Sequence, residues 1–508
     1  MMIDRGAYNP LNGRHTADWS YRPSISYKDA MPQKDSNYWS VVENNSTNAW
    51  NLNFNSGNIN NNKNNTNNVA RGVAACDGLC GYDFSGIPKE AMEDQNFIKF
   101  FEEVRFAYHD CMRGKKRSKQ ALDYMQIAYY DLPCLAWELY TNTYIPTTST
   151  CFLVKYPKLR EVFAANFRDR IVHHWIILRL EPLFEYRFVS QGNVSFNCRK
   201  GLGTNKCVLH IANGMKRVSN SYRSEAWVFK GDLVGFFMSI NKNLLWYLLE
   251  RFLKRWRFNS ERNGFEHYGL YGMREMYWDN LLHATKVTVM HHPEDNCILN
   301  SPISMWKNLA KNKSLFGCDD GEPIGNLTTQ QFANFLLSFF DAFILWIYRG
   351  KNFCYARFVD DWTIICDDKK FIISSIQKME VFLRKLSLEM HKDKRYLQPV
   401  SHGVKMVGSV IKPNRIYLSS RTLSRFEERV HGFRNLIESK EELATLDCTR
   451  IEQVINSYLG FCNGRRTYKK RKQMLEKEFG NKFFKYFYIK GRYSSIRIRP
   501  AYRPLKPL

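Results

Sequence analysis

The stretch that decides the fold is Tyr355-Ala356-Arg357-Phe358-Val359-Asp360-Asp361-Trp362-Thr363-Ile364-Ile365-Cys366. Two short apolar runs of high β propensity flank a pair of adjacent aspartates, which predicts a strand, a tight turn and a second strand. Neighbouring carboxylates repel each other, and a cation between them relieves the repulsion. Mg²⁺ suits such a place because it prefers oxygen ligands and is usually held by one or two carboxylates together with substrate phosphates. An isolated Asp-Asp pair is more often an exposed acidic turn, so the interpretation depends on the rest of the chain.

A further acidic position lies upstream, where an apolar run that begins at Ala226 ends in Gly231-Asp232. Taken alone, Asp232 is more simply a surface residue or a helix cap. One aspartate at a strand end and two at a hairpin tip can, however, meet in space as a two-metal site, which aligns an attacking hydroxyl with a leaving oxygen. The two stretches together therefore predict phosphoryl-transfer chemistry.

These stretches resemble the motifs of reverse transcriptases, in particular those of diversity-generating retroelements within the group II intron-like bacterial and phage enzymes. Asp232 stands at the first palm motif, and Phe358-Val359-Asp360-Asp361 stands at the x-x-Asp-Asp box. The stretch from Gly321 to Gln330 resembles the Gly-x-x-x-Ser-Gln motif that grips template and nucleotide, with Thr329 in place of Ser. Retroviral enzymes carry Gln-Gly where this chain has Ile324-Gly325.

The resemblance covers about residues 90–465 and implies an α+β right-hand polymerase with fingers, a palm made of an antiparallel sheet backed by helices, and a helical thumb. The boundaries that we expect are an Asn-rich extension at 1–85, a helical finger extension at 86–150, fingers at 151–225, a palm at 226–412 with an insertion at 268–319, and thumb and basic tail at 413–508. Within the finger extension, Pro133 is expected to end or kink a helix that starts near Lys119. Thumb helices are expected near 422–438 and 451–461.

The resemblance also implies the catalytic residues. Asp232, Asp360 and Asp361 would bind two Mg²⁺ ions, for which Mn²⁺ can substitute, with the backbone carbonyl of Leu233 as an extra ligand. Phe237 stands at the steric-gate position, where a ring excludes a ribose 2′-hydroxyl, and Lys394 is the expected general acid for the leaving pyrophosphate.

Substrate contacts are implied in the same way. Lys158 and Arg160 are expected to bind the triphosphate, since fixed cations offset its charge. Arg168 and Arg170 either join them or form structural ion pairs. The remaining expected contacts are Ile324, Gly325 and Gln330 at the nucleotide, Arg199 and Lys200 on template or primer, and Gly408 in the primer grip.

Composition agrees with a nucleic-acid partner without being specific for one. The chain of 508 residues carries 75 Lys and Arg against 49 Asp and Glu, a net charge of +26, and such a surplus favours a polyanion bound in a salt-sensitive way. Its 13 cysteines are scattered and odd in number, which we interpret as reduced thiols in a cytoplasmic protein. We expect no signal peptide and no membrane span, because the longest apolar run, 335–348, is short and interrupted by Ser338 and Asp341.

The Asn-rich extension has little to bury. Between Asn44 and Asn68, 14 of 25 residues are Asn, which favours disorder. The spacing of its Trp, Phe and Gly residues instead resembles the variable proteins that these retroelements diversify, which suggests a template repeat translated in frame; an ordinary linker is the alternative.

The function that we expect is RNA-directed DNA synthesis, making error-prone cDNA from a template-repeat RNA for adenine-directed diversification of a variable gene. The partners would be template RNA, a cDNA primer, deoxynucleoside triphosphates and a small basic accessory protein. The alternatives are the reverse transcriptase of a retron, an antiphage-defence system or a group II intron-like element, and, from another class, a catalytically idle RNA-binding scaffold.

Overall fold

The computed structural model describes residues 81–503, apart from 116–117, 156–157, 272, 274–275, 308, 310–313 and 319, and the backbone of three strands before them. These strands, β1 (Asn37–Asn45), β2 (Asn48–Asn53) and β3 (Asn58–Asn60), pair antiparallel in the order β1-β2-β3. The other residues before 81 lie outside the described residues, and with them most of the stretch 44–68 for which disorder or a translated template repeat was predicted.

The chain divides into two compact units. Unit 1 holds residues 1–182 and 242–329, and unit 2 holds residues 183–241 and 330–508. Each is a mixture of helices and mostly antiparallel strands, so the α+β class is confirmed.

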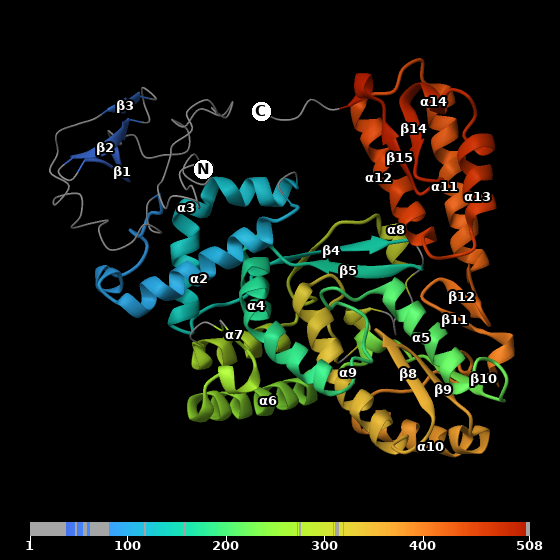
Figure 1. Ribbon diagram of the computed structural model, residues 1–508. Coiled ribbons are helices and arrows are strands. Elements are labelled where there is room, and N and C mark those ends of the chain that lie inside the picture. The colour runs from blue at the N-terminus through green and yellow to red at the C-terminus, as the bar shows by residue number, and fades with distance from the viewer. Residues whose placement is uncertain are drawn as a thin grey trace. The chain divides into compact units, whose positions relative to one another are not determined.

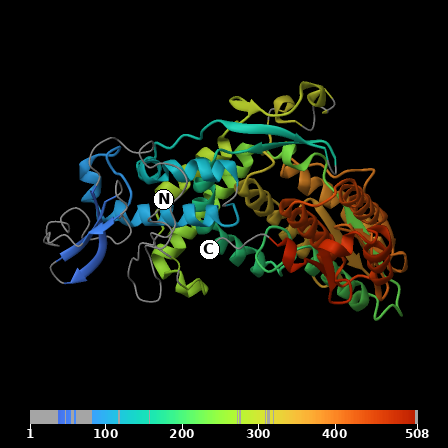
Figure 2. The ribbon, with the colours of Figure 1, turned by 90° about the horizontal axis from the view of Figure 1, so that it is seen from above.

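Besides the strands β1–β3, the described part of unit 1 combines helices with a small sheet. Its helices are α2 (Gln95–Met112), α3 (Lys119–Tyr140), the first part of α4 (Phe167–Ser190), α6 (Lys242–Asn263), α7 (Trp278–Met290) and α8 (Ile303–Trp306). The sheet has the order β5 (Arg160–Ala164), β4 (Ser149–Val154), β7 (Cys297–Leu299). Strands β4 and β5 form an extended two-stranded ribbon in both views (Figures 1 and 2). Because β7 pairs parallel to β4, the expected insertion at 268–319 contributes a strand to this sheet.

Helix α2 follows its sequence signals. Asp94 caps its N-terminus by accepting a hydrogen bond from the Asn96 amide at 2.8 Å, which satisfies one of the donors that a helix start leaves open. Phe97, Phe100 and Val104, which recur at helical spacing, are fully buried. The expected helical extension before the sheet is therefore present.

We expected Pro133 to end or kink its helix; it does not end it, because α3 runs through the proline to Tyr140. A proline lacks the amide that would bond the carbonyl four residues back, and here that carbonyl belongs to Tyr129. The Asp83 amide donates to the Tyr129 carbonyl at 2.7 Å instead. The segment before α2 thus supplies the hydrogen bond that the proline cannot, and the helix continues.

Unit 2 is built on a four-stranded antiparallel sheet in the order β10 (Tyr396–Pro399), β6 (Trp227–Gly231), β9 (Asp361–Cys366), β8 (Phe353–Phe358). Helix α5 (Thr204–Val218) packs on one face, where Ile211 and Met215 share a core with Val228 and Ile365. The strand-turn-strand expected at 355–366 is present as β8 and β9, and the sheet is antiparallel as expected.

The other face of this sheet is covered by α9 (Leu327–Ile347) and α10 (Lys369–Lys385) (Figure 1). The Phe340 ring of α9 meets Trp362 of β9 edge-on at 5.2 Å, and Phe343 stacks on Phe382 of α10 at 4.3 Å. Among the described residues, α9 is the one helix long and apolar enough to cross a membrane by length and composition, but most of it is buried inside the protein. It serves here as a core helix.

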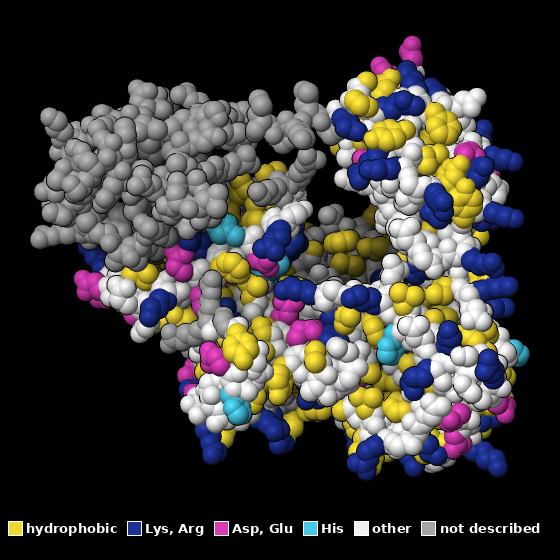
Figure 3. Space-filling view, viewed as in Figure 1, with side chains coloured by type: hydrophobic (Ala, Val, Ile, Leu, Met, Phe, Trp, Pro, Cys, Tyr) yellow, Lys and Arg dark blue, Asp and Glu magenta, His cyan; other side chains and the backbone are white. Residues whose placement is uncertain are grey.

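The C-terminal part of unit 2 is folded through residue 503, the last that the structure describes. It consists of the sheet β11 (Val404–Met406), β12 (Ser409–Lys412), β13 (Arg415–Leu418), then α11 (Ser420–Ser439), α12 (Thr445–Cys462), α13 (Tyr468–Gln473), the π-helical turn 474–478, α14 (Phe483–Tyr486) and the hairpin β14 (Phe487–Lys490), β15 (Ser495–Ile498). Phe483, Phe487 and Ile496 are fully buried in one core with α11 and α12. The two helices expected here are confirmed, and residues after 465 contribute to the same core. Lys469, Lys470 and Lys472 are exposed on α13 and form its basic ridge. Lys and Arg side chains gather along this edge of the C-terminal part in Figure 3.

Candidate active site

Strand register brings the aspartates together at one end of the β6-β9-β8 ladder. Gly231 of β6 pairs with Trp362 of β9, so Asp232, one residue further, comes beside Asp361. Phe358 pairs with Asp361 across the hairpin, which leaves Val359 and Asp360 as the turn. Residues that are more than a hundred positions apart in the chain thereby share one edge of the sheet.

Two lysines neutralise this edge. The Lys394 ammonium lies 2.5 Å from Asp232 Oδ2, and the Lys230 ammonium lies 3.1 Å from Asp361 Oδ1. Burial raises the pKa of the Asp361 carboxyl, Lys230 lowers it and the neighbouring charge of Asp232 raises it further. The net direction is upward, as expected for two carboxylates that share a partly dry site.

The backbone beside Asp232 is fixed by the segment that carries Lys394. The His391 amide donates to the Asp232 carbonyl at 2.8 Å, and the Val234 amide donates to the Glu389 carbonyl at 2.9 Å. Leu233, between them, forms an isolated antiparallel bridge with Met390. Asp232 and Lys394 are therefore delivered together by two adjacent segments of unit 2.

The donor set suits a hard divalent cation. Asp232, Asp360 and Asp361 offer only oxygen ligands, which Mg²⁺ prefers, and two ammonium groups already stand against two of the carboxylates. Among the described residues no group of three or more His, Cys, Asp or Glu side chains has the geometry of a metal site. The residues present fit a cation by their chemistry, and taking one up requires Lys230 and Lys394 to give way.

A glycine makes room next to Asp232. A Cβ atom on Gly231 would lie 2.2 Å from Cζ2 of the Trp362 indole, far inside any normal contact, so the ring packs directly on the Gly231 backbone. Four residues downstream, Gly235 has a left-handed backbone and precedes the 3₁₀ turn 236–239. This turn places half-buried Phe237 five residues after Asp232, beside the buried ring of Phe236 at 5.1 Å.

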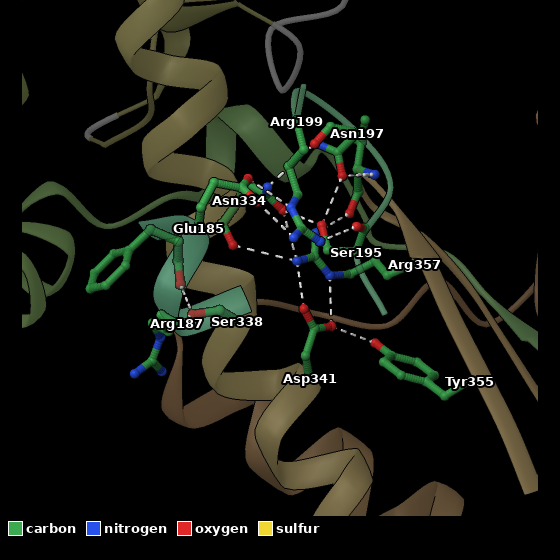
Figure 4. Close-up of polar contacts among 12 residues, drawn as sticks. Glu185, Arg187, Ser195, Asn197, Arg199, Asn334, Ser338, Asp341, Tyr355 and Arg357 are labelled. Atoms are coloured by element: carbon green, nitrogen blue, oxygen red, sulfur yellow. Dashed lines mark hydrogen bonds and ion pairs between the residues drawn. The ribbon is translucent and has the colours of Figure 1, made fainter. Parts of the chain in front are cut away.

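Arg199 lies inside the protein. Its side chain is 2% exposed, and it makes two hydrogen bonds of 2.8 Å to Glu185 (Figure 4). It also donates to the Ser195 carbonyl at 2.8 Å and to Asn193 Oδ1 at 2.7 Å. Its expected contact with nucleic acid stays a prediction, since in this structure the guanidinium holds the loop 193–199 in place.

The other expected contacts of unit 2 are surface positions. Lys200 and Gln330 are exposed, and Gln330 accepts a hydrogen bond from the Cys198 thiol at 3.2 Å. Gly408 lies in the turn between β11 and β12 with φ +74°, and a Cβ there would meet Thr422 Oγ1 at 3.0 Å. The turn needs glycine both for its conformation and for the close packing of α11.

The expected triphosphate contacts fall in unit 1. Lys158 and Arg160 are exposed at the start of β5. Arg168 is bound by Asp131 at 3.1 Å and by Glu138 at 2.8 Å, so the structural ion pair, the alternative we considered, describes it in this structure. Arg170 donates to the Ala165 carbonyl and to Gln120.

The Ile324-Gly325 pair is held against β5. The Phe163 amide donates to the Ile324 carbonyl at 2.8 Å. Gly325 has φ +134°, and a Cβ there would lie 2.4 Å from the Phe163 carbonyl oxygen. The Ile324 side chain is half-buried, so the backbone of this motif is set by glycine and by β5, while its side chain stays accessible.

Sequence reasoning missed Lys230, Arg357 and Asn197. Lys230 precedes Gly231-Asp232 on a strand, so alternation along the strand was the signal that could have marked it. Arg357 is a charged residue inside an otherwise apolar strand run, which indicates a buried ion pair. Asn197 carried no signal of its own, because its role depends on a contact with a residue more than 160 positions away.

Comparison with known proteins gives little beyond this geometry. No family model matches the sequence, and no curated protein matches it. Among solved structures, apo telomerase from Candida tropicalis is 13% identical with a TM-score of 0.41, over 66% of this chain and 56% of that one. Telomerase from Candida albicans in complex with a TWJ fragment of telomeric RNA is 12% identical with a TM-score of 0.37, over 65% of this chain and 58% of that one. The chain therefore spans less than two thirds of these telomerases, and likenesses this weak carry no conclusion about activity.

Proposed function

We propose that this protein is an RNA-directed DNA polymerase with the right-hand plan, in which unit 2 supplies the palm and thumb. The observation that carries the proposal is the register of β6 and β9, which sets Asp232 beside Asp361, with Asp360 in the adjoining turn. Separate stretches chosen from the sequence for one chemistry thus converge in the fold. The motif resemblance, the net charge of +26 and the basic ridge on α13 support the same proposal.

Each residue has a role in this proposal. Two Mg²⁺ ions held by Asp232, Asp360, Asp361 and the Leu233 carbonyl would activate the primer 3′-hydroxyl and hold the triphosphate. Lys394, which is paired with Asp232 in this structure, would be released if that carboxylate held a cation, and would then be the general acid that donates a proton to the leaving pyrophosphate. Phe237 rejects the ribose 2′-hydroxyl.

The test of the polymerase is primer extension with the full chain. An oligo(dT) primer on a poly(rA) template should grow when dTTP and Mg²⁺ or Mn²⁺ are added, and chelation should stop it. A catalytically idle RNA-binding scaffold would bind the same primer-template without extending it. Tight binding with no extension in either metal would therefore overturn the proposal in favour of the scaffold.

The finer proposal is that the enzyme makes error-prone cDNA for the diversification of a variable gene, as a cytoplasmic protein working with template RNA and a small basic accessory protein. It rests on Ile324. Retroviral enzymes have a glutamine there. A misaligned base pair leaves the glutamine amide without a hydrogen-bond partner, which makes incorporation of the wrong nucleotide less favourable. The isoleucine side chain has no hydrogen-bond donor or acceptor, so discrimination between correct and incorrect base pairs should fall.

Ile324→Gln tests this point without moving the loop, because the backbone is held by Phe163 and Gly325. Errors opposite template adenine should fall about tenfold to thirtyfold, the worth of roughly one buried hydrogen bond. Ile303→Gln, the same change at a position that is 78% exposed, is the matched control. Equal error rates in the wild type and Ile324→Gln would favour the retron, antiphage or intron-like alternatives.

A further inference from the structure

The turn that carries Asp360 has an unfavourable backbone conformation. Val359 has φ +57°, in the left-handed region that β-branched residues avoid. Such a conformation persists only where the surroundings enforce it. Two hydrogen bonds do so here, one to each end of the same residue.

We name these two bonds the turn clamp. Arg357 Nη1 donates to the Val359 carbonyl at 3.1 Å, and the Val359 amide donates to Asn197 Oδ1 at 2.9 Å. Both backbone polar groups of the residue immediately before Asp360 are thus bonded by side chains. The position of Asp360 follows from them, because its own peptide plane is shared with the Val359 carbonyl.

The first half of the clamp comes from a buried ion pair. Arg357 is fully buried, and Asp341 of α9 accepts from its Nε at 2.7 Å and from its Nη2 at 2.6 Å (Figure 4). The Tyr355 hydroxyl donates to the same carboxylate at 2.7 Å. A buried ion pair contributes little net stability compared with apolar packing. These partners orient the guanidinium and leave Nη1 directed at the turn.

The second half comes from the segment 194–197, which runs beside β8. The Arg357 amide donates to the Val194 carbonyl at 2.8 Å, and the Phe196 amide donates to the Arg357 carbonyl at 3.0 Å. Asn334 of α9 ties the two halves together: its Oδ1 accepts from Arg357 Nη2 at 2.9 Å, and its Nδ2 donates to the Asn197 carbonyl at 3.3 Å. Figure 4 shows the side chains of this network converging from β8, α9 and the 194–199 segment.

We propose that Arg357 and Asn197 are positioning residues that hold Val359 in its left-handed conformation and thereby set Asp360 for DNA synthesis. This inference rests on the proposed polymerase function. Neither side chain touches substrate in this account, and each acts through the Val359 backbone. Loss of one clamp bond should therefore lower kcat while leaving the KM for the nucleotide nearly unchanged.

The experiment is a double-mutant cycle between Asn197 and Val359 on the full chain. Asn197→Ala should lower kcat about tenfold, the scale of one hydrogen bond, with the KM for dTTP within about twofold of wild type. Asparagine tolerates the left-handed region far better than valine. In a Val359→Asn background the same Asn197→Ala change should therefore lower kcat only about twofold to threefold, because the turn no longer depends on the clamp.

The control is Asn456→Ala. The Asn456 side chain bonds both the amide and the carbonyl of Ile496 in the C-terminal part of unit 2, away from the aspartates. The substitution should leave kcat unchanged even where it lowers the melting temperature. A second readout needs no activity: hydrogen exchange at the Val359 amide should accelerate in Asn197→Ala and not in Asn456→Ala.

The outcomes separate this inference from the proposed function. One outcome is DNA synthesis that requires Asp360 and yet is unaffected by Asn197→Ala, with unchanged hydrogen exchange at the Val359 amide. That result overturns the turn clamp but agrees with the proposed polymerase function. An additive cycle, in which Asn197→Ala costs the same in both backgrounds, also overturns it. If the protein makes no DNA at all, the proposed function fails, and hydrogen exchange at the Val359 amide still tests whether Asn197 holds the turn.

Discussion

Gly231→Ala is the sharpest test of how the fold delivers Asp232. The added methyl carbon would lie 2.2 Å and 2.3 Å from Cζ2 and Cε2 of the Trp362 indole. The ring has nowhere to retreat, because Trp362 is 1% exposed and packs edge-on against Phe340 at 5.2 Å. Either the indole moves or β6 separates from β9, and each outcome displaces the residue that follows.

The size of the effect follows from the packing. Forcing an additional methyl group into a filled core costs about 1–3 kcal/mol, and the closeness of this contact points to the upper end. Gly432→Ala is the matched control, since no heavy atom lies within 4 Å of its added Cβ and it lies within helix α11. There the same substitution should stabilise by about 0.5–1 kcal/mol, as alanine does over glycine in a helix.

The assay is urea unfolding followed by circular dichroism, together with primer extension. Gly231→Ala should unfold at a lower urea concentration than wild type and lose most DNA synthesis. Gly432→Ala should unfold at a slightly higher urea concentration and keep wild-type synthesis. Trp362→Leu in the Gly231→Ala background should restore part of the activity by making room. If Gly231→Ala is as stable and as active as wild type, the packing of Trp362 on β6 does not position Asp232.

Two further predictions concern single side chains. Burial raises the pKa of Glu322 to about 8, with Lys242 and the Thr329 hydroxyl opposing the shift. Between pH 4.5, the ordinary pKa of the group, and about pH 8, the folded protein keeps a proton that the unfolded chain has released. The free energy of unfolding should therefore fall by up to ~1.4 kcal/mol per pH unit across this range. Glu322→Gln should remove this slope in thermal melts, and an unchanged slope would show that Glu322 does not titrate there. Phe237→Ala should admit ribonucleotides in primer extension, whereas Phe258→Ala, at a ring that is 62% exposed, should not; unchanged sugar selectivity in Phe237→Ala would exclude Phe237 as the gate.

Local patterns in the sequence predicted the elements that local physics determines. The hairpin around Asp360-Asp361, the strand before Asp232 and the buried face of α2 all follow from periods of two or 3.6 residues and from turn and cap residues. The two helices α11 and α12 follow in the same way.

What the sequence did not show depends on partners distant in the chain. The helix continues through Pro133 because Asp83 bonds the carbonyl that proline leaves open. The folding of residues 465–503 rests on elements of only four to six residues, too short for a periodic signal. Arg168 is engaged by acids of another helix, Asp131 and Glu138, and no spacing rule reveals such a pairing.

In the proposed polymerase, Asp232, Asp360 and Asp361 form one catalytic centre. The most direct measurement is the single-turnover incorporation of one dTMP on poly(rA)·oligo(dT) by Asp360→Asn. Asp367→Asn is the matched control: Asp367 begins a second Asp-Asp pair just beyond the opposite end of β9, is exposed and accepts a hydrogen bond from Asn352. We predict that Asp360→Asn reduces incorporation to background while still binding the primer-template, and that Asp367→Asn incorporates at the wild-type rate. Incorporation by Asp360→Asn at a rate close to that of Asp367→Asn would contradict the central claim.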